Sequence, residues 1–336
     1  MILYDGSHKI SLMDFGIEIP ISDNKRSKTL EYLEQNPIIQ KKLNSFSVIK
    51  VDERLTRMDL LRAHSPRYVD RLFSEGLEQE IIRTYELIDE KGNYNRYNPQ
   101  NAKLPLAALF NNQLEKAAGS LQCCNIALDK GFCFYFGGGN HHAKKDYGEG
   151  FCLVNDVVIS IRRLQDEKKI ETAWVIDVDA HKGDGTAALT HDDNTIKTLS
   201  IHMAKGWPLD GEQYKDGELN PSFIPSDIDI PIDSGEEHLY LERLEEGLHK
   251  LNTLGKPQIA VVVMGVDPYE KDELASTKGL NLTLEQMKKR DLLIYNFLKK
   301  QNVPQAHLMA GGYGVNSWRV YSQFLEHVLL EEIKSI

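Results

Sequence analysis

The sequence contains few cysteines, and their arrangement suits neither a structural zinc site nor a set of disulfides. Its 336 residues include four, Cys123, Cys124, Cys133 and Cys152, at spacings that match neither pattern. The neighbours Cys123 and Cys124 are typical of small buried residues on a helix. We therefore expect free cysteines in a reducing compartment.

Long hydrophobic runs and an excess of basic residues are also missing. Residues 1–9 have only a short apolar stretch before Asp5, which is too brief for a signal-peptide core, and no later stretch approaches a membrane span. The net charge of −10 disfavours general affinity for nucleic acid and mildly favours cationic substrates. We expect a cytoplasmic protein that binds neither membranes nor nucleic acid directly.

The composition is that of an ordinary globular protein, with 41% hydrophobic and 27% charged residues. No repeat, low-complexity tract or linker divides the chain, so we expect residues 1–336 to form a single domain. Apolar runs of strand length alternate with segments of helical periodicity such as 155–168 and 283–301. The runs are 132–136, 173–178, 198–203, 259–266 and 306–310. This pattern predicts an α/β fold of three layers, with a mostly parallel central sheet covered by helices on both faces.

Polar clusters follow four of these predicted strands. The stretch GGGNHH comes after 132–136, DVDAHKGDG ends the strand at 173–178, Asp267 follows 259–266, and GGYG follows 306–310. In open parallel sheets, ligands bind at the carboxyl ends of the strands, where the loops converge. The four clusters therefore predict one site.

A metal site is indicated by the spacing of Asp177, Asp179 and His181, which an extended chain directs to one side. Three buried polar groups would be costly unless a divalent cation paired with them. In isolation this motif fits a capped turn about equally well, but Asp267 favours the metal. Asp179, His181 and Asp267 would leave one open position, as catalytic zinc sites do. The imidazole favours zinc over magnesium, while iron and cobalt remain open.

The adjacent residues His141 and His142 are suited to proton transfer beside such a metal. One neutral imidazole can take a proton from the attacking water, and a second, protonated one can give a proton to the leaving amine. Asp177 and Asp184 are candidates to hold one imidazole each. The alternative for this pair is metal ligation by one histidine. Tyr313 could donate a hydrogen bond to a developing oxyanion, although elsewhere it would be taken for an ordinary loop residue.

Together these motifs resemble those of the histone deacetylase family, which belongs to the arginase–deacetylase fold group. The resemblance extends from about residue 60 to the C-terminus, and its motifs follow one another in the family's order. They are HSPRYVDRL (64–72), GGGNHHAKKDYGEGFCLVND (137–156), IDVDAHKGDG (176–185), LSIHM (199–203), GVDPYEKDEL (265–274) and GGYG (311–314). The resemblance implies a zinc-dependent amide hydrolase that removes acyl groups from lysine or similar amines.

The resemblance also implies roles for individual residues. It places one zinc ion on Asp179, His181 and Asp267. It makes His141 and His142 the base and acid, Asp177 and Asp184 their carboxylates, and Tyr313 the oxyanion donor. It further implies a structural potassium site that uses Asp177, Ser200 and the backbone carbonyls of Asp179, His181 and Ile201. Gly150 and Phe151 match one wall of an acyl-lysine tunnel, and Trp207 would supply the facing wall.

The sequence departs from the family pattern at several places. Lys182 replaces a second histidine, and DAHKGDG leans towards the class IV branch, some members of which favour long acyl groups. The segment 15–30 matches an early family motif poorly. Asn98 stands about where many relatives hold an acid that grips the peptide backbone. Deacylation is therefore better supported than a histone or peptide substrate.

Other functions stay open at this point. The same chemistry would suit a deacylase of acetylated polyamines or other small acylated amines. A two-metal ureohydrolase would need a carboxylate two residues before Asp267, where this chain has Gly265. A non-catalytic binding module is disfavoured, because every catalytic position holds a competent residue. Neither the acyl chain nor the oligomeric state follows from the sequence.

Overall fold

The computed structural model describes residues 1–6, 10–21 and 24–334, so parts of the segments 1–9 and 15–30 discussed above lie outside the described residues. Its centre is an eight-stranded sheet with the strand order β2-β1-β3-β10-β9-β4-β5-β8. All neighbouring strands in it are parallel. The strands are β1 (Ile2–Leu3), β2 (Ser47–Val48), β3 (Phe132–Tyr135), β4 (Ala173–Asp177), β5 (Ile196–Met203), β8 (Ile228–Ile232), β9 (Ile259–Val263) and β10 (Gln305–Leu308).

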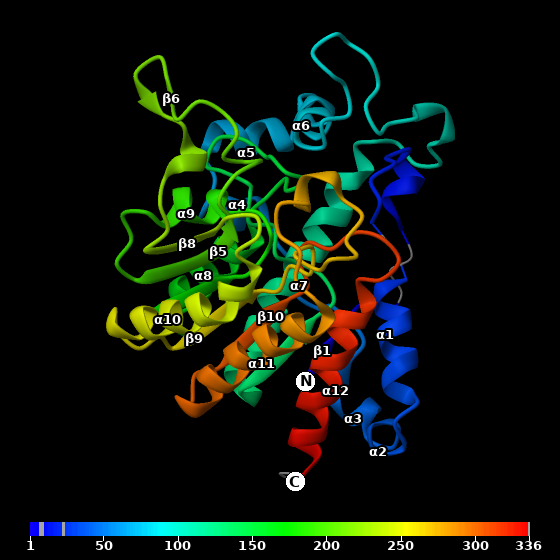
Figure 1. The fold of residues 1–336 in the computed structure, drawn as a ribbon. Helices are drawn as coiled ribbons and strands as arrows, with labels where there is room; N and C mark the ends of the chain where they lie inside the picture. The colour runs from blue at the N-terminus through cyan, green and yellow to red at the C-terminus, as the bar shows by residue number, and fades with distance from the viewer. Residues whose placement is uncertain (7–9, 22–23, 335–336) are drawn as a thin grey trace.

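Helices surround this sheet, and a small antiparallel hairpin, β6 (Tyr214–Lys215) and β7 (Glu218–Leu219), projects from it (Figure 1). The α-helices are α1 (Lys25–Glu34), α2 (Pro37–Gln40), α3 (Leu43–Phe46), α4 (Arg57–Leu60), α5 (Pro66–Leu72), α6 (Leu77–Thr84), α7 (Ala108–Lys130), α8 (Asp156–Asp166), α9 (Asp184–Thr190), α10 (Tyr240–Thr253), α11 (Leu284–Lys300) and α12 (Trp318–Lys334). Short 3-10 helices are η1 (Leu12–Phe15), η2 (Pro99–Asn101), η3 (Pro221–Phe223), η4 (Glu237–Leu239) and η5 (Ala275–Thr277). None of the helices in the described ranges has the length and apolar character needed to cross a lipid bilayer.

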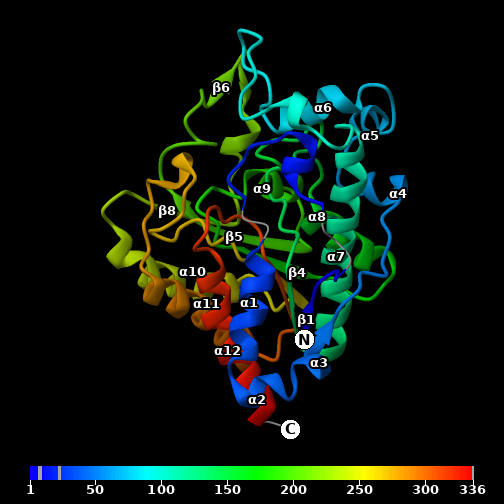
Figure 2. The same ribbon diagram turned by 90° about the vertical axis from the view of Figure 1, so that its right-hand side faces the viewer.

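The two faces of the sheet carry separate hydrophobic cores, because successive side chains of a strand point in opposite directions. Phe132 and Phe134 of β3 pack in the core formed with α1 and α10 to α12. Cys133 and Tyr135, between and after them, pack in the core formed with α7 and α8. The helices of the two layers lie on opposite sides of the sheet in Figure 2. The predicted three-layer α/β fold is confirmed.

The sequence located the central strands well and the outer strands poorly. All five predicted strands and both predicted helices are present, with ends that differ by a few residues. The outer strands β1, β2 and β8 were missed. Strands β1 and β2 have only two residues each, and β8 has the sequence IDIPI, whose Pro231 is tolerated in strands mainly at sheet edges. Cys123 and Cys124 lie buried on α7, and the four cysteines are free.

Strands β3, β10, β9 and β4 are neighbours in the sheet, so the four polar clusters that follow them meet at one edge. Above this edge a third core joins η1, α4 to α6 and the first turns of α7. This layer of short helices and loops holds the segments that surround the site (Figure 1).

Candidate active site

Three predicted metal ligands come together at the ends of β4 and β9. The ligand atoms of Asp179, His181 and Asp267 all lie within 4.8 Å of one another, and the three side chains are buried. Nδ1 of His181 is 3.2 Å from Oδ1 of Asp179 and 3.2 Å from Oδ2 of Asp267. Two ligands of one tetrahedral zinc ion, each about 2.0–2.1 Å from it, are separated by ~3.3 Å. Both distances from His181 therefore fit ligands that share one metal ion.

The electrostatics of this cluster also fit a divalent cation. Oδ2 of Asp267 is buried and accepts no hydrogen bond from the described part of the chain. Burial and the charge of Asp179 raise the pKa of Asp267 to about 7. Burial alone would lower the pKa of His181, but the two carboxylates raise it to about 10. A cation between the three groups would satisfy both acids and allow a neutral imidazole to ligate.

Ser276 of η5 fixes the orientation of His181. Its hydroxyl lies 3.1 Å from Nε2 of His181, so a proton on Nε2 can be donated to it. That tautomer leaves the lone pair of Nδ1 facing the two carboxylates. A hydrogen bond on the far nitrogen is the usual way in which a protein orients a metal-ligating histidine.

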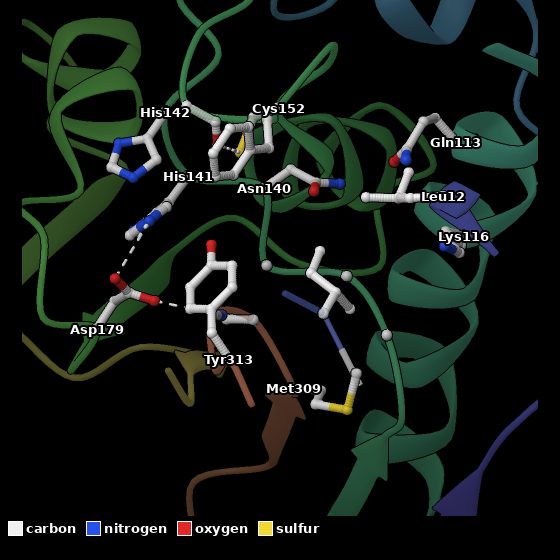
Figure 3. Close-up of a pocket in the computed structure, with 18 of the residues that line it drawn as sticks. Leu12, Gln113, Lys116, Asn140, His141, His142, Cys152, Asp179, Met309 and Tyr313 are labelled. Atoms are coloured by element: carbon white, nitrogen blue, oxygen red, sulfur yellow. Dashed lines mark hydrogen bonds and ion pairs between the residues drawn. The ribbon is translucent and has the colours of Figure 1, made fainter. Parts of the chain in front are cut away.

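His141 and His142 each contact one of the two aspartates that were predicted to hold them. Nδ1 of His141 is 2.6 Å from Oδ2 of Asp177, and Nδ1 of His142 is 2.7 Å from Oδ1 of Asp184. The two ring centroids are 3.9 Å apart, and Nε2 of His141 is 3.8 Å from Oδ1 of Asp179. Figure 3 shows both imidazoles at the same end of the cavity as Asp179. Each carboxylate thus holds one nitrogen and leaves the other for chemistry.

The two imidazoles have opposite electrostatic environments. Burial lowers the pKa of His141, but Asp177 and Asp179 outweigh it and raise the value to about 9. Burial and the neighbouring His141 lower the pKa of His142 to about 3. Asp184 favours the charged form of His142 but does not outweigh these two effects.

Asp184 has two further partners. Nζ of the buried Lys144 lies 2.7 Å from Oδ2 of Asp184, and the Ser222 hydroxyl donates to the same oxygen at 2.7 Å. Lys144 also pairs with Glu149, so its ammonium group offsets part of the charge of Asp184, which orients His142 through Oδ1. Asp177, in contrast, remains available to a charged His141.

The loop that carries the histidines is fixed by its backbone. Gly139 has φ of 81°, and a Cβ there would lie 2.6 Å from Cβ of Ala310, so only glycine fits. The carboxylate of Asp156 accepts the N–H groups of Gly139 and Asn140 at 3.0 and 2.7 Å. Farther along, His64 bridges the same loop, with Nδ1 2.7 Å from the Lys144 carbonyl and Nε2 accepting the Asn155 N–H at 3.0 Å.

Tyr313 faces the histidines from the loop after β10. Asp272 accepts its backbone N–H at 2.7 Å, and Nζ of Lys25 donates to the carbonyl of Gly312 at 2.9 Å. The hydroxyl points into the cavity (Figure 3). Burial raises the pKa of Tyr313 well above its usual value, so the hydroxyl stays protonated as a donor.

These groups line one end of a cavity of about 450 Å³. Phe151 forms part of its wall and has a left-handed backbone with φ of 66°, and Gly150 before it has φ of 54°. The guanidinium of Arg96 lies 5.3 Å from the centroid of the Phe151 ring. The remaining lining residues are Ile10, Leu12, Ile21, Lys25, Arg26, Tyr85, Gln113, Lys116, Phe136, Gly137, Gly138, Gly139, Asn140, His141, His142, Gly150, Cys152, Asp179, His181, Met309, Ala310, Gly311 and Tyr313.

Trp207 packs directly on the site. Its ring centroid is 4.5 Å from that of His142 and 5.4 Å from that of His181. A Cβ on Gly150 would lie 2.4 Å from Cη2 of the indole, so these two residues are in close contact. The indole thus covers the two imidazoles, and its role as a tunnel wall opposite Phe151 stays a prediction.

The residues of the expected potassium site are also neighbours. Asp177 pairs with Ser200 in the parallel register of β4 and β5, and Ile201 follows on β5. The Gly183 N–H donates to the Ser200 hydroxyl at 3.3 Å. Lys182 donates to the carbonyl of Ile224 at 2.8 Å and takes no part in the ligand cluster. Potassium binding itself stays a prediction.

Three residues that support this site were not predicted from the sequence. Lys144, Asp272 and Ser276 all lie inside or next to motifs that it had singled out. Their position near a motif is the only indication of such a role in the sequence. The residues that Lys144 and Asp272 contact lie 40 and 41 positions away. Sequence spacing contains no information about such contacts.

Comparisons with known proteins agree on one family. Residues 20–329 match the model of the histone deacetylase domain. The chain is 24% identical over 327 residues to Histone deacetylase 2 of Arabidopsis thaliana, covering 97% of this chain and 78% of that protein. It is 28% identical over 281 residues to the acetoin utilization protein AcuC of Staphylococcus aureus, covering 82% of this chain and 68% of that protein.

A solved structure has the same fold. The crystal structure of an HDAC homolog complexed with SAHA superposes with a TM-score of 0.67 and 20% identity. The match covers 99% of this chain and 83% of that one. At this identity the likeness concerns the fold, and the arrangement of the site comes from the side chains described above.

Proposed function

Because the chain belongs to the histone deacetylase family of amide hydrolases, we propose that it removes acyl groups, acetyl or longer, from the side-chain amine of lysine in proteins, with one zinc ion per chain. Residues 1–336 would act as a single catalytic domain. The observation that carries this proposal is the buried cluster of Asp179, His181 and Asp267 beside two histidine–carboxylate pairs.

Asp179, His181 and Asp267 would hold the ion. When bound, it would polarise the acyl carbonyl and make a nearby water molecule more acidic. Iron could occupy the same ligands. The family's potassium ion would lie at Asp177, Ser200 and the carbonyls of Asp179, His181 and Ile201, where it would support the ends of β4 and β5.

His142 is the group that we assign as the base. Burial and the neighbouring His141 favour its neutral form and Asp184 orients it, so the imidazole can accept the proton of the attacking water. His141 lies 2.6 Å from Asp177, which with Asp179 favours its charged form, and it is suited to give a proton to the departing amine. The pair thereby splits the two proton transfers of amide hydrolysis.

Tyr313 would donate a hydrogen bond to the carbonyl oxygen as it gains negative charge. Its backbone is held by Asp272, and its hydroxyl points into the cavity that the histidines line. The cavity of about 450 Å³ is larger than an acetyl group requires, which supports the inclusion of longer acyl chains.

Arg96 favours acyl-lysine over the alternative substrates, acetylated polyamines. Its guanidinium lies over Phe151, and it is partly neutralised by Glu86 at 2.7 Å. A polyamine would bring further positive charges close to this group, whereas a peptide offers carbonyl oxygens that the guanidinium can bind. A two-metal ureohydrolase is disfavoured, because it would need a carboxylate at position 265. A Cβ there would lie 2.2 Å from Oδ2 of Asp179, so the structure has no room for that side chain.

A substrate panel with metal analysis tests the proposal. Acetyl-lysine and long-acyl-lysine peptides should be hydrolysed faster than acetylated spermidine and putrescine, by protein that holds about one transition metal per chain. Faster turnover of the polyamines would favour the alternative substrate class. Two metal equivalents that are both needed for activity would contradict the single-ion mechanism.

A further inference from the structure

Arg290 is a fully buried arginine whose role the sequence did not suggest. It lies on α11 and is 0% exposed, and its neighbour Asp291 is 1% exposed. Nε and Nη2 of Arg290 both lie 2.8 Å from Oδ1 of Asp291. An ion pair removed from water in this way costs desolvation free energy, and replacing such a pair by apolar residues is often neutral or stabilising. Stability alone is therefore a weak reason for its presence.

The third nitrogen of Arg290 reaches the two chain segments that carry the metal ligands. Nη1 donates to the Val178 carbonyl at 2.9 Å and to the Gly265 carbonyl at 2.8 Å. Val178 directly precedes Asp179, and Gly265 comes two residues before Asp267. One nitrogen on α11 thus connects two segments that are far apart in the sequence.

These carbonyls lie where the sheet stops providing cross-links. The ladder between β4 and β9 ends at the pair Asp177 and Val263, and the Val178 N–H still donates to the Val263 carbonyl at 3.1 Å. Beyond this point the two chains leave the sheet to form the site. Buried carbonyls need a donor, and Nη1 of Arg290 supplies it.

The segments are also in direct contact at this level. A Cβ at Gly265 would lie 2.6 Å from Cα of Asp179, so the two backbones approach as closely as glycine allows. Oδ1 of Asp267 accepts the Ala180 N–H at 2.9 Å. A shift of either segment would therefore change the distance between the two carboxylate ligands.

We propose that Arg290 is a positioning residue for the metal centre: its Nη1 cross-links the ends of β4 and β9 and so fixes the separation of Asp179 and Asp267. This inference rests on the metal site of the proposed function. Arginine suits the task because its guanidinium is planar, so the hydrogen bond from Nε to Asp291 also sets the direction of Nη1. A lysine would offer the charge without that fixed direction.

The experiment separates positioning from a general contribution to stability. Zinc affinity is measured by competition with a chromophoric chelator, and the ligand geometry by the visible absorption of the Co²⁺ form. The thermal midpoint of each metal-free protein is measured in parallel. The variants are Arg290→Met, Arg290→Lys and the double variant Arg290→Met/Asp291→Leu, which leaves no unpaired charge.

Asp59→Asn is the matched control. Asp59 is also 0% exposed, and it pairs with Arg62 at 2.9 Å and Arg163 at 2.6 Å between α4 and α8. Neither of these ion pairs involves a metal ligand. This variant should lower the thermal midpoint while zinc affinity stays within about twofold of the wild type.

All Arg290 variants should bind zinc more weakly, by roughly 10- to 100-fold, which is the usual effect of removing a group that supports metal ligands. The Co²⁺ spectrum should change as well. If Arg290→Met does not fold, the zinc affinity of the double variant tests the proposal. Wild-type zinc affinity in the double variant would overturn the proposal, and so would an equal loss in Asp59→Asn. If the wild-type protein binds no divalent metal, the proposed function fails instead.

Discussion

The metal-ligand end of the cavity and its aromatic wall are built in different ways. Asp179 and Asp267 follow adjacent central strands, and the backbones that carry them are cross-linked by the sheet and by Arg290. Phe151 and Tyr313 lie on loops whose contacts come from distant segments, such as the Thr84 carbonyl that accepts the Phe151 N–H at 3.1 Å. The ligand end is thus fixed by the sheet, whereas the wall depends on several separate contacts.

The difference predicts how each region responds to substitution. Changes at the ligand end should remove metal and abolish all activity together. Changes in the wall should leave the metal in place and alter turnover, binding or selectivity separately.

The largest effect is expected at the ligands. Asp179→Asn and Asp267→Asn should each lose the metal and reduce activity by roughly a thousandfold or more, because the remaining ligands cannot hold the ion in its geometry. Elemental analysis and activity are measured on protein purified without chelators. His142→Ala is the control that should keep the metal and still lose activity. Metal loss in that variant would mean that a ligand has been assigned as a base.

Tyr313→Phe should have the next largest effect. Its ring and packing are kept, so metal content and folding should hardly change, while the turnover number falls by roughly a hundred- to a thousandfold, as for other oxyanion donors. Single-turnover kinetics and binding of a hydroxamate inhibitor are the measurements. If the variant keeps more than about a third of the wild-type turnover, a loss under 1 kcal/mol, another group stabilises the oxyanion.

Phe151→Ala should act on binding rather than on chemistry. Removing the ring takes apolar contact from the acyl-lysine chain, and a loss of about 1.4 kcal/mol corresponds to a tenfold rise in KM. Steady-state kinetics on acetyl and long-acyl peptides would separate KM from kcat. Unchanged kinetics on every acyl chain would remove Phe151 from the substrate path and weaken the distinction between the two regions.

The smallest effect is expected at Arg96. Arg96→Glu should shift the ratio of kcat/KM between acetylspermidine and acetyl-lysine peptide up to about fivefold in favour of the polyamine, because partly exposed charges interact weakly. Arg243→Glu is a matched control, since Arg243 also pairs with a glutamate, at 2.6 Å, and is similarly exposed. An equal shift in both variants would show that net charge, and not the position of Arg96, determines the ratio.

Much of the site could be predicted because strand ends in a parallel sheet meet at one edge. Four apolar runs followed by polar residues are enough to group Asp179, Asp267, His141 and Tyr313. The sequence also predicted that Asp177 and Asp184 would hold one histidine each. In the structure, Asp177 contacts His141 at 2.6 Å and Asp184 contacts His142 at 2.7 Å. The opposite environments of the two imidazoles could not be predicted, because they depend on the burial of the two rings and on the charged groups that the fold places beside each of them.

The sequence by itself determined the α/β fold, the order of the central segments and the residue types that meet at the sheet edge. These features follow from apolar runs and from alternation along a strand, which are properties of neighbouring residues. Only the tertiary structure decided that Lys144 pairs with Asp184, that Trp207 covers the imidazoles and that Arg290 connects the segments of Asp179 and Asp267. Each of these contacts joins residues dozens of positions apart, and the packing of helices and loops around the sheet brings them together.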